Sequence, residues 1–217
     1  KEFCSKAIAD QCETIFGGEV VSDLPEEVFL VNFLRDDIYD EDGVMQEEAP
    51  KVYEPGGTLP EVRTRVQTFL DKYNEENPSR KMELVLFDDA LKHLIRLNRL
   101  MEMPRGSGLL VGVGGSGKQS LTRLSAYISR AMCFQVTLTK TYNQASLLED
   151  IRILYRSAGA QKQTVFLFTE SEIKAESFLE TLNSVLMTGE VPGLFAKDEM
   201  MAFTADLRPS FLKNRPG

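Results

Sequence analysis

The chain has 217 residues, of which 42% are hydrophobic and 27% are charged, and its formal net charge is −8. These proportions are typical of a folded globular protein, and they exclude a disordered or fibrous one. The negative charge opposes binding to a phosphate backbone, so nucleic acid is not an expected partner. Apolar runs such as Val165 to Phe168 are far shorter than the roughly 20 residues of a membrane span, and no leader opens the sequence, so we expect neither membrane nor secretion.

The three cysteines, Cys4, Cys12 and Cys133, are an odd number and lack the spacing of zinc ligands. They argue against a disulfide framework and favour a reducing, intracellular compartment. Because the sequence begins with Lys1 instead of methionine, we expect it to be a piece of a longer protein.

Residues 1–78 are irregular in pattern, and we predict that they form a connecting segment. Apolar spacing indicates short helices over 6–16 and 61–73, and the apolar run 28–33 has the length of a strand. An acidic stretch without Lys or Arg contains Asp36, Asp37, Asp40, Glu41, Asp42, Glu47 and Glu48. Like charges repel one another, and the spacing is not that of a calcium-binding loop, so residues 36–48 are predicted to be a solvated loop.

Residues 79–217 alternate between helix and strand signals, and we predict a second domain over this range. Helices are predicted over 88–101, 119–132, 146–157 and 175–187, and strands over 109–111, 133–138 and 165–168. Strands that alternate with helices indicate a parallel sheet with right-handed crossovers. The predicted fold class is therefore α/β.

A glycine-rich segment lies between the first of these strands and the next helix, with the sequence Gly112-Val113-Gly114-Gly115-Ser116-Gly117-Lys118-Gln119-Ser120. Such glycines let backbone N–H groups surround a phosphate, and Lys118 is placed to reach the terminal phosphates of a nucleotide. The spacing also fits a dinucleotide-binding loop, which requires an acidic residue after the second strand. Because Thr139-Lys140-Thr141 stands there, we favour a site for ATP or ADP formed by residues 112–120.

Two positions where this motif usually places magnesium-holding residues are altered, and we call Gln119 and Thr169 the metal-side residues. Gln119 stands where the motif has a Ser or Thr whose hydroxyl ligates magnesium. Ser120 is one residue later, and on a helix this shift rotates its side chain by roughly 100° away from the metal. Thr169 replaces an Asp after the third predicted strand, whereas Glu170 keeps the position that orients the attacking water. We expect Mg2+ to be weakly held, with a carbonyl oxygen from Gln119, and Glu170 to be the catalytic candidate. Glu172 is a further acidic residue near the metal side.

Other titratable residues carry no chemistry in this interpretation. Arg123 and Arg130 lie on one side of the predicted helix after the glycine-rich segment and are expected to be surface charges, with a contact to a neighbouring module as the alternative. The only histidine, His93, has no Ser or Cys partner nearby in the sequence and is expected at the surface.

Several segments together resemble the fourth AAA+ module of dynein heavy chains, particularly the axonemal ones. Pro104-Arg105-Gly106 followed by residues 109–121 carries the closest resemblance. Residues 84–90, 168–170 and 189–195 resemble further segments of that module in the same order. The resemblance implies a P-loop NTPase fold of AAA+ type, a three-layer αβα arrangement with a parallel sheet, which stops before the sensor strand and the helical lid.

The resemblance also implies a function. The fourth module of such a motor ring binds nucleotide and regulates the main ATPase module, and the metal-side residues suit binding with weak or no hydrolysis. By position, residues 112–120 would hold the phosphates, and Val85 and Leu86 would lie beside the adenine. The alternatives are a structural ring spacer whose site is empty or permanently filled with ADP, and an independent P-loop ATPase or kinase.

Partners and location follow from the same resemblance. Neighbouring AAA+ modules of the same heavy chain would contact this module, and one of them would complete its site with an arginine. Microtubules and the dynein intermediate and light chains would be partners of the full-length protein. The expected location is the cytoplasm and cytoskeleton, in the axoneme of a cilium or flagellum.

Overall fold

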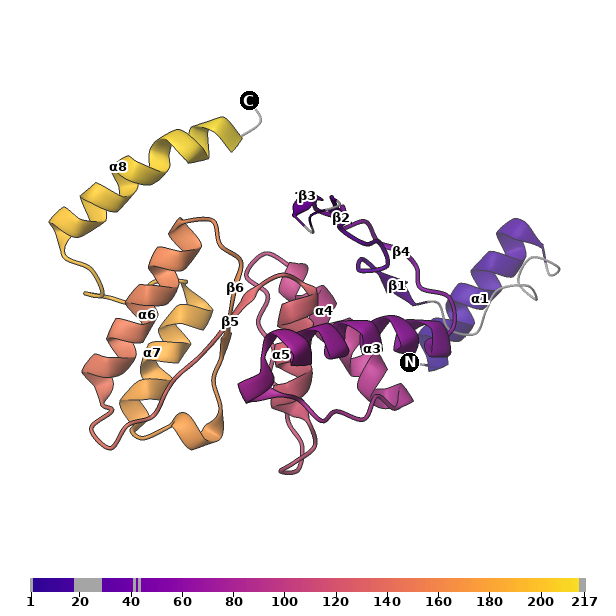
Figure 1. Ribbon diagram of the computed structural model, residues 1–217, viewed down its shortest axis with the longest axis horizontal. Coiled ribbons are helices and arrows are strands. Elements are labelled where there is room, and N and C mark those ends of the chain that lie inside the picture. Colours follow the sequence, from indigo (N-terminus) through magenta and orange to yellow (C-terminus); the bar gives the residue numbers. More distant parts are fainter. Residues whose placement is uncertain (1, 18–28, 41, 43, 215–217) are drawn as a thin grey trace. The chain divides into compact units, whose positions relative to one another are not determined.

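The structure is a computed structural model that describes residues 2–17, 29–40, 42 and 44–214 (Figure 1). The chain forms two compact units, of which the first ends at Val62 and the second begins at Arg63. The start of an AAA+ subdomain near residue 79 stays a prediction. Among the described residues, no helix is both long enough and apolar enough to cross a membrane.

The first unit contains one helix and two short antiparallel strand pairs. Helix α1 spans Glu2–Phe16. Strand β1 (Leu30–Val31) pairs with β4 (Glu54–Pro55), and β2 (Ile38–Tyr39) pairs with β3 (Met45–Glu47). Val28, at the start of the predicted apolar run, lies outside the described residues.

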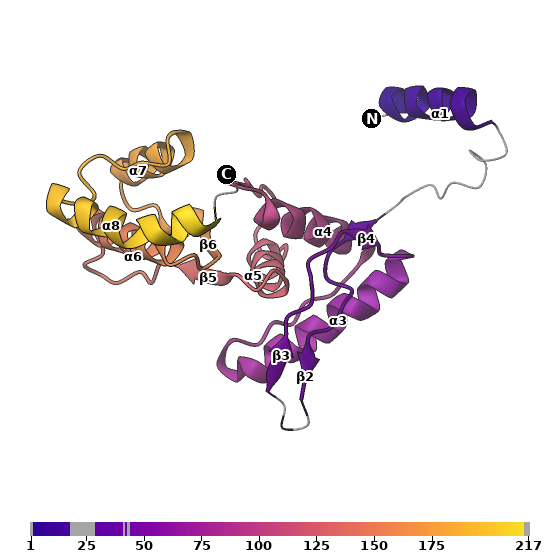
Figure 2. The same cartoon turned by 90° about the horizontal axis from the view of Figure 1, so that it is seen from above.

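The acidic stretch contains the antiparallel pair of β2 and β3 (Figure 2). Its described residues between Asp36 and Glu48 are mostly exposed, as a solvated loop requires, while Glu41 lies outside the described residues. Asp40 organises the turn, because its Oδ1 accepts hydrogen bonds from the N–H groups of Asp42 (3.1 Å) and Val44 (2.7 Å). Asp40 therefore has a local structural role.

Helix α3 (Leu59–Glu76) crosses from the first unit into the second, where the 3-10 turn η1 (Pro78–Arg80) and helix α4 (Asp88–Glu102) follow. The apolar spacing of α4 forms one buried stripe, which contains Ala90, Leu91, Leu94, Ile95 and Leu97. This stripe faces helix α5 (Lys118–Ile128), and α4 and α5 pack against each other. Inside the contact, Asn98 Nδ2 donates a hydrogen bond to Ser129 Oγ at 2.8 Å, so the pair of helices has a polar as well as an apolar core.

The second half of this unit is an α/β arrangement. Strands β5 (Met132–Gln135) and β6 (Thr164–Leu167) pair in parallel, and helix α6 (Gln144–Gly159) connects them. Helix α7 (Glu176–Met187) lies beside α6 (Figure 1). A hydrophobic cluster joins these elements and contains Val136, Leu147, Ile151, Phe178 and Leu194. The predicted parallel α/β fold is therefore confirmed over these elements.

One predicted strand is wrong. Residues 109–111 form no strand in the structure, and Leu109 and Val111 are 90% and 86% exposed. A parallel strand is stabilised by backbone hydrogen bonds from its neighbours in the sheet. Among the described strands, β5 and β6 pair only with each other, so nothing pairs with the residues before the glycine-rich segment.

Two further details depart from the sequence prediction. Helix α8 (Lys197–Asn214) was not predicted, and it contains Pro209, a residue that usually argues against a helix interior. Helix α6 extends two residues beyond the predicted end at residue 157, to Gly159, and Ala160 is its C-cap. At the other end of α6 a hydrogen-bonded cap is present, where Asn143 Oδ1 accepts from the N–H groups of Ala145 and Ser146.

Candidate nucleotide-binding site

The glycine-rich segment needs glycine at two positions because of its backbone conformation. Gly115 has φ +75° and Gly117 has φ +76°, which is the left-handed region that residues with a Cβ adopt at a cost. Gly117 is also the N-cap of α5, and a Cβ there would lie 3.3 Å from Leu84 Cδ1. The tight loop and the start of the helix therefore depend on this glycine.

Lys118 is the first residue of α5, and its side chain folds back over the loop. Its Nζ donates hydrogen bonds to Gly112 O at 2.8 Å, Val113 O at 2.7 Å and Ser116 Oγ at 3.0 Å. The first helical hydrogen bond comes from the Leu121 N–H, so the amides before it lie at the positive end of the helix. An ammonium group and a helix N-terminus thus meet at one loop, which suits a phosphate.

Gln119, one of the metal-side residues, is exposed on the first turn of α5. Its Oε1 accepts a hydrogen bond from Arg123 Nη2 at 3.3 Å, one helical turn away. The same guanidinium group donates to Gln135 Oε1, at the end of β5. Arg123 is partly buried and hydrogen-bonded on both sides, so the prediction that it is a surface charge is wrong.

Thr169, the other metal-side residue, lies just after β6 and begins the short 3-10 turn η2 (Glu170–Glu172). Its N–H donates to Glu172 Oε2 at 2.6 Å, and its Oγ1 lies 2.9 Å from Ser171 Oγ. Glu172 is only 4% exposed, and its Oε1 accepts a hydrogen bond from Gln135 Nε2 at 2.9 Å. Glu170, the catalytic candidate, is exposed on η2.

These contacts form a continuous series, which we call the Arg123 network and which consists of Gln119, Arg123, Gln135, Glu172 and Thr169. The network exists because Gln135 pairs with Leu167 in the parallel sheet, which brings the ends of β5 and β6 to one edge. Sequence reasoning did not single out Gln135. The available signal was an uncharged polar residue within an apolar strand.

The residues predicted to contact adenine differ in their surroundings. Val85 is 78% exposed, whereas Leu86 is 7% exposed and belongs to the core. Their exposures fit a segment that contributes one side chain to packing and leaves the next one accessible. A role for both beside the base stays a prediction.

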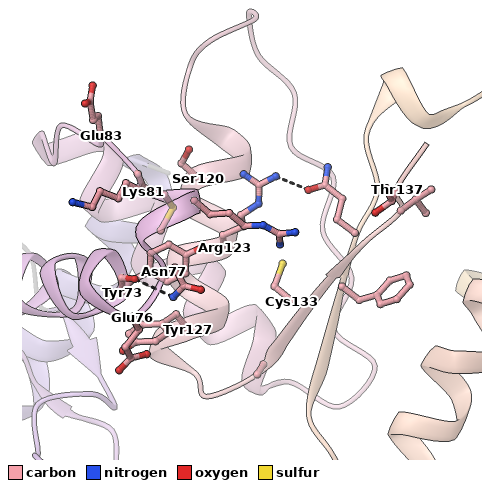
Figure 3. A pocket seen from close by; sticks show the side chains of 16 residues that line it. Tyr73, Glu76, Asn77, Lys81, Glu83, Ser120, Arg123, Tyr127, Cys133 and Thr137 are labelled. Atoms are coloured by element: carbon pink, nitrogen blue, oxygen red, sulfur yellow. Dashed lines mark hydrogen bonds between the residues drawn. The ribbon is translucent and has the colours of Figure 1, made fainter. Parts of the chain in front are cut away.

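A cavity of about 870 Å³ adjoins the Arg123 network, since Arg123 and Gln135 are among the residues that line it (Figure 3). It is lined by the end of α3, residues 80–83, α5 and β5, and residues 112–119 do not line it. Ser120 does line this cavity, as expected if the helix rotates it away from the phosphate loop. Cys133 also lines it, and partial burial raises the pKa of its thiol, which makes this cysteine a weak nucleophile.

The oxygens on the metal side of the loop have hydrogen-bond partners in the protein, for which a bound Mg2+ would compete. The Gln119 carbonyl oxygen, the Thr169 hydroxyl and both Glu172 oxygens already have hydrogen-bond partners in the protein. Within the described parts of the chain, no group of three or more His, Cys, Asp or Glu residues could hold a metal ion.

The parallel strands, the connecting helix and the phosphate loop together define an incomplete α/β P-loop fold of AAA+ type. A family described as "P-loop containing dynein motor region D4" matches residues 82–215. The chain therefore belongs to the dynein heavy chain family.

Curated relatives agree with this family. The chain is 47% identical over 218 residues to mouse (Mus musculus) dynein axonemal heavy chain 5. This alignment covers 97% of the chain and 5% of the mouse protein. It is 45% identical over 225 residues to the dynein gamma chain of the flagellar outer arm of Chlamydomonas reinhardtii, covering 100% of the chain and 5% of the relative. Human (Homo sapiens) dynein axonemal heavy chain 8 is 39% identical to it over 230 residues, and the alignment covers 95% of the chain and 5% of the human protein. The chain thus spans a small part of these relatives.

Proposed function

We propose that this chain is the nucleotide-binding fourth AAA+ module of a dynein heavy chain and that it binds ATP or ADP through residues 112–120. The observation that carries the proposal is the position of Lys118, whose ammonium group is held over the glycine-rich loop at the N-terminus of α5. A phosphate would meet this charge together with the first amides of the helix. The family match over residues 82–215 supports the same function.

The proposed role is regulatory, with weak or no hydrolysis. Phosphoryl transfer depends on charge neutralisation at the metal and on a group that orients the attacking water. Glu170 is exposed at the end of β6 and available for the second task. The metal-side residues Gln119 and Thr169 are hydrogen-bonded to the protein, so a metal would have to compete with those hydrogen bonds for their oxygens.

The alternative is a ring spacer with an empty or permanently ADP-filled site. One observation favours it: Lys118 Nζ already has three oxygen acceptors within the loop, so the loop is internally satisfied without a ligand. A nucleotide would have to replace some of these contacts. The two functions differ in whether nucleotide binds reversibly.

For the full-length protein we propose a microtubule motor whose AAA+ modules form a ring, with this module between its neighbours and with intermediate and light chains as further partners. The printed names of the relatives, which are axonemal and flagellar dyneins, support a place in the axoneme of a cilium or flagellum. These names also support the cytoskeleton as the compartment.

Calorimetric titration of ATP and ADP into the chain and into Lys118→Ala tests the binding function. Charged hydrogen bonds contribute about 1.5 to 3 kcal/mol, so we expect micromolar binding that weakens at least about tenfold in Lys118→Ala. Lys162→Ala removes an exposed lysine elsewhere and is the matched control, which should bind as the unsubstituted chain does. Equal affinities in all proteins would refute the phosphate loop, and no heat from a chain that circular dichroism shows to be folded would favour the spacer.

A further inference from the structure

The Arg123 network connects the first turn of α5 to the segment after β6, and each of its members has a defined partner. Arg123 donates to Gln119 on its own helix and to Gln135 on the neighbouring strand. Gln135 donates to Glu172, which in turn accepts from the Thr169 N–H. Figure 3 shows Arg123 at the face of α5 that is turned toward β5.

The Arg123 guanidinium and the Glu172 carboxylate fix the orientation of the two glutamine amides in the network. A guanidinium group only donates hydrogen bonds and an ionised carboxylate only accepts them. Gln135 must therefore turn its Oε1 to Arg123 and its Nε2 to Glu172, as it does in the structure. By the same rule Gln119 must turn its Oε1 to Arg123, so its NH2 group is directed away from the guanidinium.

The buried carboxylate keeps Arg123 in place. Glu172 is 4% exposed, and a buried carboxylate is stable only when its oxygens are hydrogen-bonded and an opposite charge is near. Both of its oxygens have donors, and Gln135 links them to the guanidinium. Arg123 is therefore linked to the buried carboxylate through Gln135, whereas Gln119 is the exposed member of the network.

We propose that Arg123 acts as a positioning residue that turns the Gln119 amide into a phosphate donor, and that the site therefore takes metal-free nucleoside di- or triphosphate in preference to the magnesium complex. This inference rests on the proposed nucleotide-binding function. In the usual site a hydroxyl oxygen after the lysine ligates magnesium. Here the corresponding oxygen accepts a hydrogen bond from Arg123, and the two N–H donors of the same amide belong to the residue that follows Lys118 in the sequence. Donors match a phosphate that carries its full negative charge.

The test is the ADP affinity of the full 217-residue chain, measured by calorimetry in excess Mg2+ and in excess EDTA. We expect the chain to bind metal-free ADP at least as tightly as Mg-ADP. Gln119→Met removes the two donors and should weaken the binding of metal-free ADP by about tenfold while changing the binding of Mg-ADP much less. Because Gln119 is exposed, this variant should fold normally.

Arg123→Met releases the Gln119 carbonyl and should shift the ratio of the two dissociation constants in favour of Mg-ADP by about tenfold. A general structural defect would weaken both dissociation constants together and leave their ratio unchanged. Arg96→Met removes an exposed arginine from α4 and is the control, in which we expect neither constant to change.

The outcomes separate this inference from the function on which it rests. Binding of ADP that requires Mg2+ in the unsubstituted chain, or an unchanged dissociation constant for metal-free ADP in Gln119→Met, overturns the role of the Arg123 network and leaves nucleotide binding intact. Absence of binding under both conditions by a folded chain overturns both proposals.

Discussion

Replacing Gly117 with alanine should destabilise the second unit by an amount that the loop geometry sets. The residue has φ +76°, and a residue with a Cβ in that region costs roughly 1 to 2 kcal/mol. The new Cβ would also lie 3.3 Å from Leu84 Cδ1, a close contact that the partly buried Leu84 can relieve by moving. Backbone strain is therefore the main cost.

Gly114→Ala is the matched control for this prediction. Its φ is not positive and a Cβ there meets no atom within 4 Å. Both substitutions reduce the freedom of the unfolded chain equally, so the difference between them isolates the strain at Gly117. For a domain of this size, about 1 to 2 kcal/mol corresponds to a melting temperature about 2 to 8 °C lower.

Thermal denaturation followed by circular dichroism, repeated with urea, measures this difference. Melting temperatures of Gly117→Ala and Gly114→Ala that agree within error would refute the reasoning, because they would show that the start of α5 does not require the left-handed conformation.

Two further predictions concern hydrogen bonds elsewhere in the second unit. Asn98→Ala removes the buried hydrogen bond from Asn98 Nδ2 to Ser129 Oγ and should lower the free energy of unfolding by about 1 to 3 kcal/mol, measured by urea denaturation; an unchanged midpoint would contradict it. Burial, followed by its hydrogen bond to Asp150, raises the pKa of Tyr142 far above its usual value of about 10. The unfolded chain therefore loses this proton first, so stability should fall as pH rises above about 10. Tyr142→Phe should make this fall shallower, while the raised pKa of the partly buried Tyr155 keeps part of it. An equally steep fall in Tyr142→Phe would contradict the prediction.

The parts of the fold that could be predicted are those whose signals are local. Helix α4 has an apolar stripe of helical period and acidic residues in its first turn, and β5 and β6 are short apolar runs between helices. The glycine-rich loop is equally local, because its conformation depends on glycines and on one lysine at fixed spacing. These features need no knowledge of distant residues.

The parts that could not be predicted depend on distant residues. Residues 109–111 have the composition of a buried strand, but a strand forms only where a neighbour pairs with it. Arg123 and Gln135 are 12 positions apart, and Gln135 and Glu172 are 37 apart, so no spacing rule could join them. Helix α8 lacks a regular apolar stripe and contains Pro209, so neither its periodicity nor its composition indicated it.

The exposure of the residues before the phosphate loop has a consequence for the strength of nucleotide binding. The loop is anchored at its far end, where α5 packs on α4, while Leu109, Val111 and Val113 are 90%, 86% and 79% exposed at its near end. Without a pairing strand, the near end depends on the hydrogen bonds from Lys118 to Gly112 and Val113, and any fraction of time that the loop spends outside its binding geometry would lower the apparent affinity by that fraction. A strand that paired with residues 109–111 would tighten the grip on phosphate without touching the nucleotide, so assembly of the sheet and occupancy of the loop are thermodynamically linked.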